Sequence, residues 1–533
     1  MVEGELFMGI DVGTTNAKCM VFNDKGEVVA SATREYPTYF PKPGWVEQDP
    51  EDWWRAVVEA VRECVNKFKG GKIGGIGVSS QREGVVLLDK SGKPLGRVMI
   101  WMDRRSLPQA ERIKQEYDIR EIYRRTGVIV DPTFTATKLL WLKENEPELL
   151  RKAGVLLQAK DYIIYKLTGA KVTDYSIASR TMLLDVIKRE WAYDLFEEWD
   201  LPQDKFPELK YSDEIVGEVS EEASAETGLA KGIPVVAGGG DRSCETLGAG
   251  ILDSSIVEES TGTGSTTATT LDKPLFDPKM RVIITCHVIK GKWGLEVGIS
   301  TAGAILRWFR DNLGLPEKLA SAIMRRRAYE LMDMEAEYVP PGSHGLLLVP
   351  FFMGARAPRW KPEARGVLFG LTLYHSRAHI ARAIMEGVAY ELRKVMEVLK
   401  ELGIEVKELR ALGGGGKTPL WAKIKADVIK VKVSIPKVLD AACLGGAILA
   451  SLGTGYFKDV RDAVNNMVSI ERNFETNPEN SKIYDKLYNI YNKLIDSVSP
   501  LFKELSEFAK VEPRPVEWDV EKLIHLLYRL ETY

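Results

Sequence analysis

The chain has 533 residues, of which 45% are hydrophobic, 28% charged and 9% aromatic, a composition that excludes the disordered and fibrous classes. With 73 Lys and Arg against 76 Asp and Glu, the formal net charge is −3, and no long run of one sign occurs. No overall positive field therefore exists to attract nucleic acid or anionic lipid, and we expect neither as a partner.

The first third of the chain predicts three strands, a helix and a fourth strand. The three strands are expected at Leu6–Asp11, Lys18–Asn23 and Glu27–Thr33, separated by turns rich in Gly, Thr and Asp. Asp49-Pro50 is a helix start signal. Apolar residues then recur at helical spacing: Trp53, Trp54, Val57, Ala60 and Val61. The apolar run Ile73–Ser80, bounded by glycines, is typical of a buried strand.

The second half repeats this order from about residue 251. Strands are expected at Ile256–Ser260, Ser265–Thr270, Arg281–Ile289 and Trp293–Val297, followed by a helix at Thr301–Asn312. A strand, a turn rich in Gly and Thr, and a second strand thus occur twice, which predicts a pseudo-duplicate of two α/β halves. Two such halves facing each other would leave a deep cleft, where ligand sites concentrate.

The two repeated turns are Gly13-Thr14-Thr15-Asn16 and Gly262-Thr263-Gly264. A backbone without Cβ atoms can approach a phosphate closely and point N–H groups at its oxygens, and Thr hydroxyls add further donors. Either turn alone is more typical of a tight hairpin. Because the turns occupy the same place in both halves, we favour a polyphosphate held from two sides.

A third glycine-rich segment is Gly413-Gly414-Gly415-Gly416-Lys417-Thr418. It fails the phosphate-loop pattern G-x-x-x-x-G-K-[ST] by one residue, because Ala411 stands where the first glycine is needed. A strand at Glu408–Leu412, a glycine turn and a helix from about Pro419 remain as the prediction. That arrangement suits a base and ribose lying on bare backbone, and a turn without a ligand is the alternative.

Two carboxylates are the candidates for acid/base and metal chemistry. Asp241 follows three glycines at the end of the apolar strand Pro234–Ala237, where a carboxylate can take a proton from a hydroxyl. Asp11 ends the first strand beside the Gly13 turn, where it could hold water on Mg²⁺. A surface turn and an Asx turn are the corresponding alternatives without chemistry.

Cysteine and histidine offer no metal site. The five cysteines lack a CxxC pair, and they are expected to be reduced thiols. His375 and His379 are four residues apart, but no HExxH motif or third ligand accompanies them. No apolar run reaches the roughly 18 residues of a membrane span, and the first ten residues lack a basic leader, so a cytoplasmic enzyme is expected.

Several ordered motifs together resemble the FGGY carbohydrate kinases over about residues 5 to 500. They are Gly9-Ile10-Asp11-Val12-Gly13-Thr14-Thr15, Gln81-Arg82-Glu83-Gly84, Trp101-Met102-Asp103-Arg104, Gly239-Gly240-Asp241, the segment from Gly370-Leu371-Thr372 to Val388-Ala389-Tyr390, and Gly414-Gly415-Gly416-Lys417-Thr418 with Ala426-Asp427. The resemblance implies an α/β fold of two actin-like, ribonuclease H-like domains that face a central cleft and close on ATP and a sugar or polyol. The boundaries are expected at 1–250 for the sugar side, 251–500 for the nucleotide side and 501–533 for a helical extension.

Site roles follow from the resemblance together with the turns. Asp241 is expected to be the catalytic base on the accepting hydroxyl and to touch the acceptor, and Asp11 to lie near Mg²⁺. The other residues expected at the acceptor are Arg82, Glu83, Trp101, Asp103 and Arg242. Those expected at ATP are Thr14, Thr15, Asn16, Gly262, Thr263, Gly303, Arg307, Gly414 and Gly415.

The acceptor pocket is mixed within the family. Gln81-Arg82-Glu83 is similar to glycerol kinases, whereas Gly84–Asp89 is more similar to xylulokinases, which usually have Met-His where this chain has Arg82-Glu83. Thr133 and Thr266 replace a tyrosine and an aromatic residue of glycerol kinases, and Arg242 replaces a glutamine. We therefore expect transfer from ATP to a terminal hydroxyl of a ketose or polyol of four to six carbons, as in xylulokinases, with glycerol kinase as the alternative.

Two other classes and two further expectations remain. An actin-like or chaperone-type ATPase would not need Arg82, Glu83 and Asp241 around an acceptor, and a sugar-responsive repressor would need an N-terminal helix-turn-helix ahead of the first strand. A homodimer is one expected assembly. Past Val511, residues Val520–Leu530 place their apolar side chains on one helical face, which predicts docking on the chain itself or on a neighbouring subunit.

Overall fold

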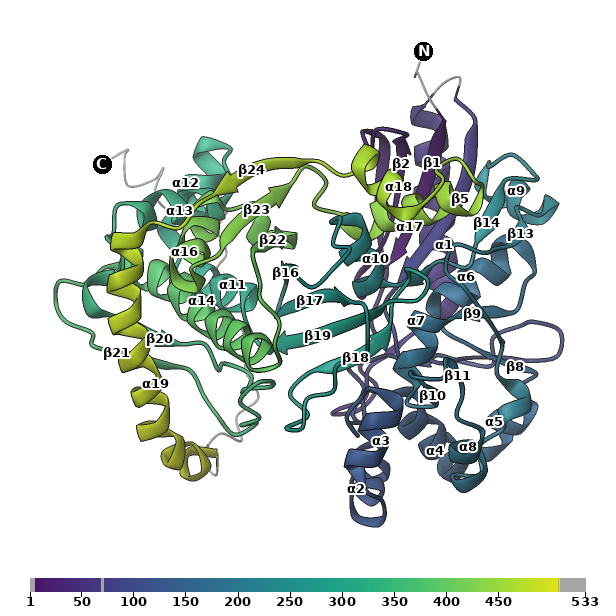
Figure 1. Ribbon diagram of the computed structural model, residues 1–533, viewed down its shortest axis with the longest axis horizontal. Helices are drawn as coiled ribbons and strands as arrows, with labels where there is room; N and C mark the ends of the chain where they lie inside the picture. The colour runs from purple at the N-terminus through teal and green to yellow at the C-terminus, as the bar shows by residue number, and fades with distance from the viewer. Residues whose placement is uncertain (1–4, 69–70, 507, 509–533) are drawn as a thin grey trace, which may run out of the picture. The chain divides into compact units, whose positions relative to one another are not determined.

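The computed structural model describes residues 5–68, 71–506 and 508 (Figure 1). It forms two compact units. The first contains Met1–Ser254, Ala268–Glu296 and Asp440–Ser469, and the second contains Ser255–Thr267, Val297–Leu439 and Ile470–Tyr533. The domain boundaries expected at residues 250 and 500 stay predictions, because each compact unit is built from several separate stretches of the chain. The helix predicted at Val520–Leu530 lies outside the described residues.

The sheet of the first unit has the strand order β13-β14-β5-β1-β2-β3. β1 (Leu6–Val12) pairs antiparallel with β2 (Asn16–Asn23) and parallel with β5 (Ile73–Ser80), as the hairpin and the buried strand in the sequence indicate. β3 (Val28–Glu35), β14 (Pro234–Val236) and β13 (Ile215–Glu218) complete this order, and β15 (Gly239–Gly240) pairs with β5. This register sets Asp11 beside Ser79.

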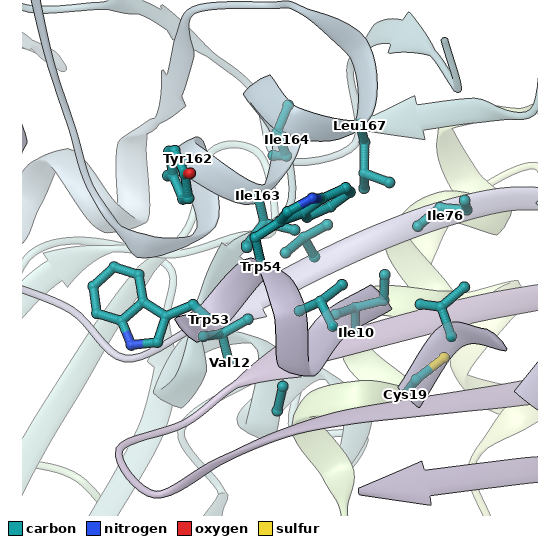
Figure 2. Close-up of a cluster of buried hydrophobic side chains, with 14 of the residues drawn as sticks. Ile10, Val12, Cys19, Trp53, Trp54, Ile76, Tyr162, Ile163, Ile164 and Leu167 are labelled. Atoms are coloured by element: carbon teal, nitrogen blue, oxygen red, sulfur yellow. The ribbon is translucent and has the colours of Figure 1, made fainter. Parts of the chain in front are cut away.

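Helix α1 (Pro50–Lys67) covers one face of this sheet. Asp49 caps it by accepting a hydrogen bond from the Glu51 N–H, and Pro50 takes the first turn, where no donor is needed. Figure 2 shows Trp54 of α1 with Ile163 of α6 (Ala159–Thr168) and Ile10 of β1 in one buried cluster. The helix predicted from the Asp49-Pro50 start signal is confirmed.

Helix α17 (Ala441–Gly453) lies against the backbone of β1 and β5 and packs on α10 (Asp241–Gly248). A Cβ atom at Gly9 would collide with the carbonyl oxygen of Cys443, and one at Gly77 with that of Gly446. The glycines therefore allow two backbones to meet where side chains would hold them apart.

The rest of the first unit is an insertion between β5 and β13, followed by α9, with its own apolar cluster around Trp141, Phe134 and Phe196. Its elements are β6 (Val86–Leu88), β7 (Val98–Met99), α2 (Leu107–Glu116), α3 (Ile119–Thr126), α4 (Thr135–Asn145), α5 (Pro147–Lys152), β8 (Val155–Leu157), β9 (Val172–Asp174), α7 (Tyr175–Ala178), β10 (Leu184–Asp185), β11 (Glu190–Trp191), α8 (Tyr193–Glu198), β12 (Glu208–Lys210) and α9 (Glu221–Thr227). β4 (Glu47–Gln48) pairs with β7, and α18 (Val460–Met467) follows α17.

The second sheet repeats the topology of the first. β16 (Ile256–Thr261) is parallel to β22 (Glu408–Leu412), which is parallel to β23 (Lys432–Pro436), and β24 (Ile470–Phe474) closes the edge antiparallel. β17 (Ser265–Leu271), β19 (Trp293–Ile299) and β18 (Ile283–Cys286) continue the order on the other side of β16. The order β17-β16-β22-β23-β24 matches β2-β1-β5-β14-β13, so the pseudo-duplication predicted from the sequence is present.

The helices of the second unit gather on α14 (Arg377–Glu401), α16 (Pro419–Ile429) and α19 (Pro478–Ser506), around buried tyrosines such as Tyr390 and Tyr484. The others are α11 (Gly303–Asn312), α12 (Leu315–Met324), α13 (Ala328–Glu337) and α15 (Gly413–Gly416), with the strand pair β20 (Leu347–Val349) and β21 (Val367–Phe369). The glycine segment predicted as a turn is thus one turn of helix. Across the described residues, no helix is both long and apolar enough to cross a membrane.

Candidate active site

Asp241 is the first residue of α10, immediately after β15. The Gly240 N–H donates a hydrogen bond to Ser176 Oγ at 2.9 Å, which fixes the glycine bend ahead of the helix. The first turn of a helix favours a carboxylate because its N–H groups carry partial positive charge. The Asp241 side chain is 27% exposed, so a hydroxyl can reach it while its neighbours hold it in place.

Arg82 links Asp241 to a buried carboxylate. Its Nε lies 2.8 Å from Asp241 Oδ1, and its two terminal nitrogens reach Glu296 Oε1 and Oε2 at 2.5 and 3.1 Å. Arg180 joins the same group, 3.5 Å from Glu296 Oε2, and its Nε donates to Glu83 Oε1 at 2.5 Å. Two guanidinium groups and three carboxylates therefore form one continuous network in the first unit.

Burial disfavours the charges of Glu296 and Arg82, yet the opposite charges beside them keep both ionised. Burial alone would raise the pKa of Glu296, but Arg82 and Arg180 bring it to about 2. Burial would lower the pKa of Arg82, but Glu296 and Asp241 raise it instead. Glu296 and Arg82 are thus ionised across the physiological range, and Arg82 presents Asp241 with a permanently cationic neighbour.

Glu83 has a strained backbone that other residues fix. Its φ is 70°, in the left-handed region that a glutamate rarely adopts. The Glu83 N–H donates to Gln158 Oε1 at 2.9 Å, and its carbonyl oxygen accepts from Thr135 Oγ1 at 3.1 Å and Lys138 Nζ at 3.0 Å. Strain of this kind persists where the surrounding structure enforces it, often at a binding site.

Asp11 lies close enough to Asp241 for the two carboxylates to repel. Burial first, and then Asp241, raise the pKa of Asp11 to about 6, while a hydrogen bond from Ser79 Oγ at 2.9 Å opposes the shift. A divalent cation would relieve this repulsion, so the residues fit Mg²⁺. No group of three or more His, Cys, Asp or Glu side chains that could hold a metal ion occurs in the part of the chain that the structure describes. An ion here would need phosphate oxygens and water as its other ligands.

The Gly13 turn joins β1 and β2 next to Asp11. The Gly13 N–H bonds the Asn16 carbonyl at 3.0 Å, and the Asn16 amide donates to Thr15 Oγ1 at 3.0 Å, with Thr15 exposed. Trp101 Nε1 donates to Thr14 Oγ1 at 3.0 Å. One of the residues expected at the acceptor thus contacts one expected at the phosphates.

Asp103 and Arg242 have partners other than an acceptor. Asp103 is fully buried, where it accepts from Arg105 Nε at 3.0 Å and from the Val46 N–H at 2.7 Å. Arg242 forms an ion pair with Glu245 one turn along α10. Asp103 and Arg242 are thus already partnered within the first unit, and their contact with an acceptor stays a prediction.

The second unit brings the Gly262 turn against the start of α11. The Gly262 N–H bonds the Gly264 carbonyl at 2.8 Å, and the Ala302 and Ala304 N–H groups both donate to the Thr263 carbonyl, at 3.0 and 3.1 Å. A Cβ atom at Gly303 would collide with the Gly262 carbonyl. Arg307, on the next turn of α11, is exposed.

The glycine run packs on the same turn. Gly413 forms a parallel bridge with Thr261, and a Cβ atom at Gly415 would collide with Thr261 Oγ1. Beneath the run, buried Lys425 contacts Thr261 Oγ1 at 3.1 Å and pairs with Glu259. Gly414 faces outward. The expected nucleotide residues Gly262, Thr263, Gly303, Gly414 and Gly415 therefore lie together in this unit.

Comparison with known proteins shows to which family the chain with this arrangement belongs. Residues 6–248 match the N-terminal domain of the FGGY family of carbohydrate kinases, and residues 259–454 match its C-terminal domain. The chain belongs to the FGGY family of carbohydrate kinases. The enzyme class and the mixed α/β two-domain fold expected from the sequence are thereby confirmed, and the protein is an ATP-dependent phosphotransferase.

Relatives of this FGGY kinase differ in their named substrates. The xylulose kinase of Bacillus subtilis is 32% identical over 94% of this chain and 99% of its own, and the glycerol kinase of Thermococcus kodakarensis is 33% identical over 92% and 96%. Among solved structures, gluconate kinase from Lactobacillus acidophilus has a TM-score of 0.84 at 26% identity, covering 94% of this chain and 99% of its own. Glycerol kinase of Plasmodium falciparum with ADP has a TM-score of 0.82 at 26% identity, covering 92% and 98%.

Sequence reasoning missed Arg180 and Glu296 of this FGGY kinase. Glu296 lies in the otherwise apolar strand β19, and a single carboxylate inside such a run is a signal of a buried ion pair that could have been followed. Its partner could not be identified, because Arg82 is 214 positions away in the sequence.

Proposed function

We propose that this kinase transfers the γ-phosphoryl group of ATP to a terminal hydroxyl of a neutral ketose or polyol of four to six carbons. The observation that carries the proposal is the network in which Arg82 holds Asp241 while Arg180 holds Glu83. These groups offer several fixed donors and acceptors around one accessible carboxylate, which is what an acceptor with many hydroxyls requires.

Asp241 acts as the general base in the proposed reaction. It accepts the proton of the acceptor hydroxyl, the hydroxyl oxygen forms a bond to the γ-phosphorus, and the bond from that phosphorus to the β,γ-bridging oxygen breaks, which releases ADP. The Gly13 turn of the first unit and the Gly262 turn of the second each offer N–H groups and hydroxyls of the kind that bind phosphate. Mg²⁺, when bound, would be held by Asp11 and phosphate oxygens and would neutralise phosphate charge.

The charge of the site favours an uncharged acceptor. The network holds two cations, Arg82 and Arg180, against three anions, Glu83, Asp241 and Glu296. Its excess is negative, and Asp11 adds to it once ionised. A sugar acid would bring a further negative charge into this environment, so we place gluconate behind the neutral ketoses and polyols.

The size of the acceptor is argued from one side chain of the first unit. Thr133 replaces a ring with a small hydroxyl, which already bonds Asp131 Oδ1 at 2.6 Å and so adds space rather than a free donor. A short ligand would leave some of the fixed polar groups unpaired, at about 1–3 kcal/mol each. Glycerol remains the competing acceptor, because the Arg82-Glu83 pair is similar to that of glycerol kinases.

A single acceptor screen tests the proposal. Values of kcat/KM are measured with ATP and Mg²⁺ for glycerol, erythritol, xylulose, ribulose, xylitol, hexitols and gluconate. We expect a neutral compound of four to six carbons to exceed glycerol by about tenfold or more. Glycerol as the best substrate would overturn the size argument, and gluconate as the best would overturn the charge argument.

A further inference from the structure

The Gly13 turn has its carbonyl oxygens occupied by donors from the interior of the first unit. The Tyr36 hydroxyl donates to the Gly13 carbonyl, and Gln48 Nε2 donates to the Thr14 carbonyl at 2.6 Å. The Tyr36 N–H donates to the Thr15 carbonyl at 3.3 Å. Tyr36 follows β3 and Gln48 ends β4, and both side chains are buried, whereas the turn is exposed at Thr15. Three consecutive carbonyls of the turn therefore face inward.

The inward carbonyls decide where the N–H groups of the turn point. A trans peptide is planar, with its N–H opposite its carbonyl, and both peptides from Gly13 to Thr15 are trans. Holding the Gly13 and Thr14 carbonyls inward thus turns the Thr14 and Thr15 N–H groups outward. Neither N–H has a hydrogen-bond partner among the residues that the structure describes. Two adjacent, uncommitted N–H groups in a turn form a cradle for an anion.

The amide of Gln48 is held in a single orientation. Its Oε1 accepts from Trp53 Nε1 at 3.0 Å and from Gln81 Nε2 at 2.7 Å, and its Nε2 also donates to Thr38 Oγ1 at 2.8 Å. Because an indole N–H only donates, the amide oxygen must face Trp53, which leaves the nitrogen to face Thr14. Both donors and both acceptor positions of this fully buried amide are therefore used, and the Thr14 carbonyl is held in one position.

We propose that Gln48 and Tyr36 are positioning residues for phosphoryl transfer, which hold the N–H groups of the Gly13 turn towards the phosphates of ATP. The inference rests on the proposed function, in which this turn binds phosphate. A peptide released from its inward donor is free to rotate and present its carbonyl oxygen to the phosphate, and the partial negative charge of that oxygen repels the ligand. Neither side chain touches ATP in this proposal, since both act through the turn.

The test removes one donor at a time. Tyr36→Phe deletes a single hydroxyl, and Gln48→Met deletes the amide but keeps the length of the side chain. We expect each variant to lower kcat/KM for ATP by about 10- to 100-fold, the usual contribution of one hydrogen bond to a charged group, and to leave KM for the acceptor within about twofold. The matched control is Gln109→Met, at a buried glutamine of the same unit whose amide donates to Glu144 Oε2 at 2.7 Å. This control should retain the wild-type values.

Binding without turnover separates positioning from a purely structural role. The probes are adenosine, which lacks phosphates, and the β,γ-imido analogue of ATP with Mg²⁺, each titrated by calorimetry. Loss of positioning should weaken binding of the analogue by about tenfold or more, while adenosine binds as it does to wild type. A structural loss would instead reduce the number of binding sites and kcat, and would leave the Kd of both probes unchanged.

Wild-type kcat/KM for ATP in either variant would overturn the role of that side chain, as would equal weakening of adenosine and the analogue. Both results leave the proposed kinase reaction intact. A wild-type protein that binds the analogue but phosphorylates no acceptor in the screen would overturn the proposed function, and the Kd values of the variants would still test the two side chains. Should Gln48→Met fail to fold, Tyr36→Phe alone decides, because a wild-type Kd for the analogue in that variant contradicts the proposal.

Discussion

Asp241 has two properties that no other residue of the network combines. A ligand can reach its carboxylate, and a cationic side chain is fixed beside it. Replacing it by Asn keeps the shape of the side chain and removes the proton acceptor. We expect Asp241→Asn to lower kcat by about 10²- to 10⁴-fold, the usual contribution of a general base, while ADP binding is retained. Turnover under saturating substrates and ADP titration measure the two effects separately.

The matched control for this variant is Asp272→Asn. Asp272 is a carboxylate of the same unit that pairs with Lys292 and is largely exposed. Its replacement should leave turnover within about twofold, because surface ion pairs contribute little. Retention of more than about a tenth of wild-type turnover in Asp241→Asn would exclude this carboxylate as the base.

His287 is a buried imidazole that the fold keeps neutral. Its Nδ1 accepts from the Ile289 N–H at 3.1 Å, which leaves Nε2 to donate to Thr246 Oγ1 at 2.7 Å. Burial, with Lys292 nearby, lowers its pKa from 6.5 to about 3. Between pH 6.5 and pH 3 this imidazole binds a proton in the unfolded chain but not in the folded protein. The free energy of unfolding therefore falls as pH decreases from 6.5 towards 3.

This effect is measurable as a slope. Below pH 6.5, the free energy of unfolding should decrease by up to about 1.4 kcal/mol per pH unit through His287 alone. Urea denaturation at several pH values should give His287→Gln a shallower acid slope than wild type. His375→Gln, at a more exposed histidine, should not change it. Parallel curves for wild type and His287→Gln would refute this account.

At the scale of elements, the contact of α17 with β1 and β5 depends on glycine. A methyl group at Gly77 would have to displace the backbone of α17 at Gly446, because the obstacle is a carbonyl rather than a flexible side chain. We expect Gly77→Ala to destabilise the protein by about 1–3 kcal/mol, the cost of overpacking. Gly96→Ala is the control, since nothing lies within 4 Å of its added carbon. Thermal unfolding of both variants gives the comparison, and equal melting temperatures would contradict the packing argument.

Elements with a strong local signal were predictable. The strands expected at Ile73–Ser80 and Glu408–Leu412 have the expected bounds. The Gly413–Gly416 segment was expected as a turn, and it is helical because it packs on Thr261 rather than because of its own propensity. The strand expected at Arg281–Ile289 is shorter, at Ile283–Cys286. Local pattern thus gives an element's existence more reliably than its ends.

At the scale of the whole molecule, the repeated sheet order and the family could be predicted from the sequence. Contacts between residues far apart in the sequence could not. The pairing of Arg82 with Glu296 and the packing of α17 on β1 depend on how the chain returns to its first unit. No local periodicity records such a return. The partners of Asp103 could not be predicted for a related reason: its motif identifies the residue but not what its side chain contacts.

The return of Asp440–Ser469 to the first unit has a consequence for the protein during its synthesis. Strands β1 and β5 leave the ribosome early, yet the helix that covers their glycine-rich face is encoded more than 350 residues later than the end of β5, between Ala441 and Gly453. At about 5–20 residues per second, translation takes tens of seconds to reach that helix. Throughout this interval the nascent chain carries an apolar sheet face without its native cover, so the first unit stays incomplete while residues Val297–Leu439 of the second unit are synthesised.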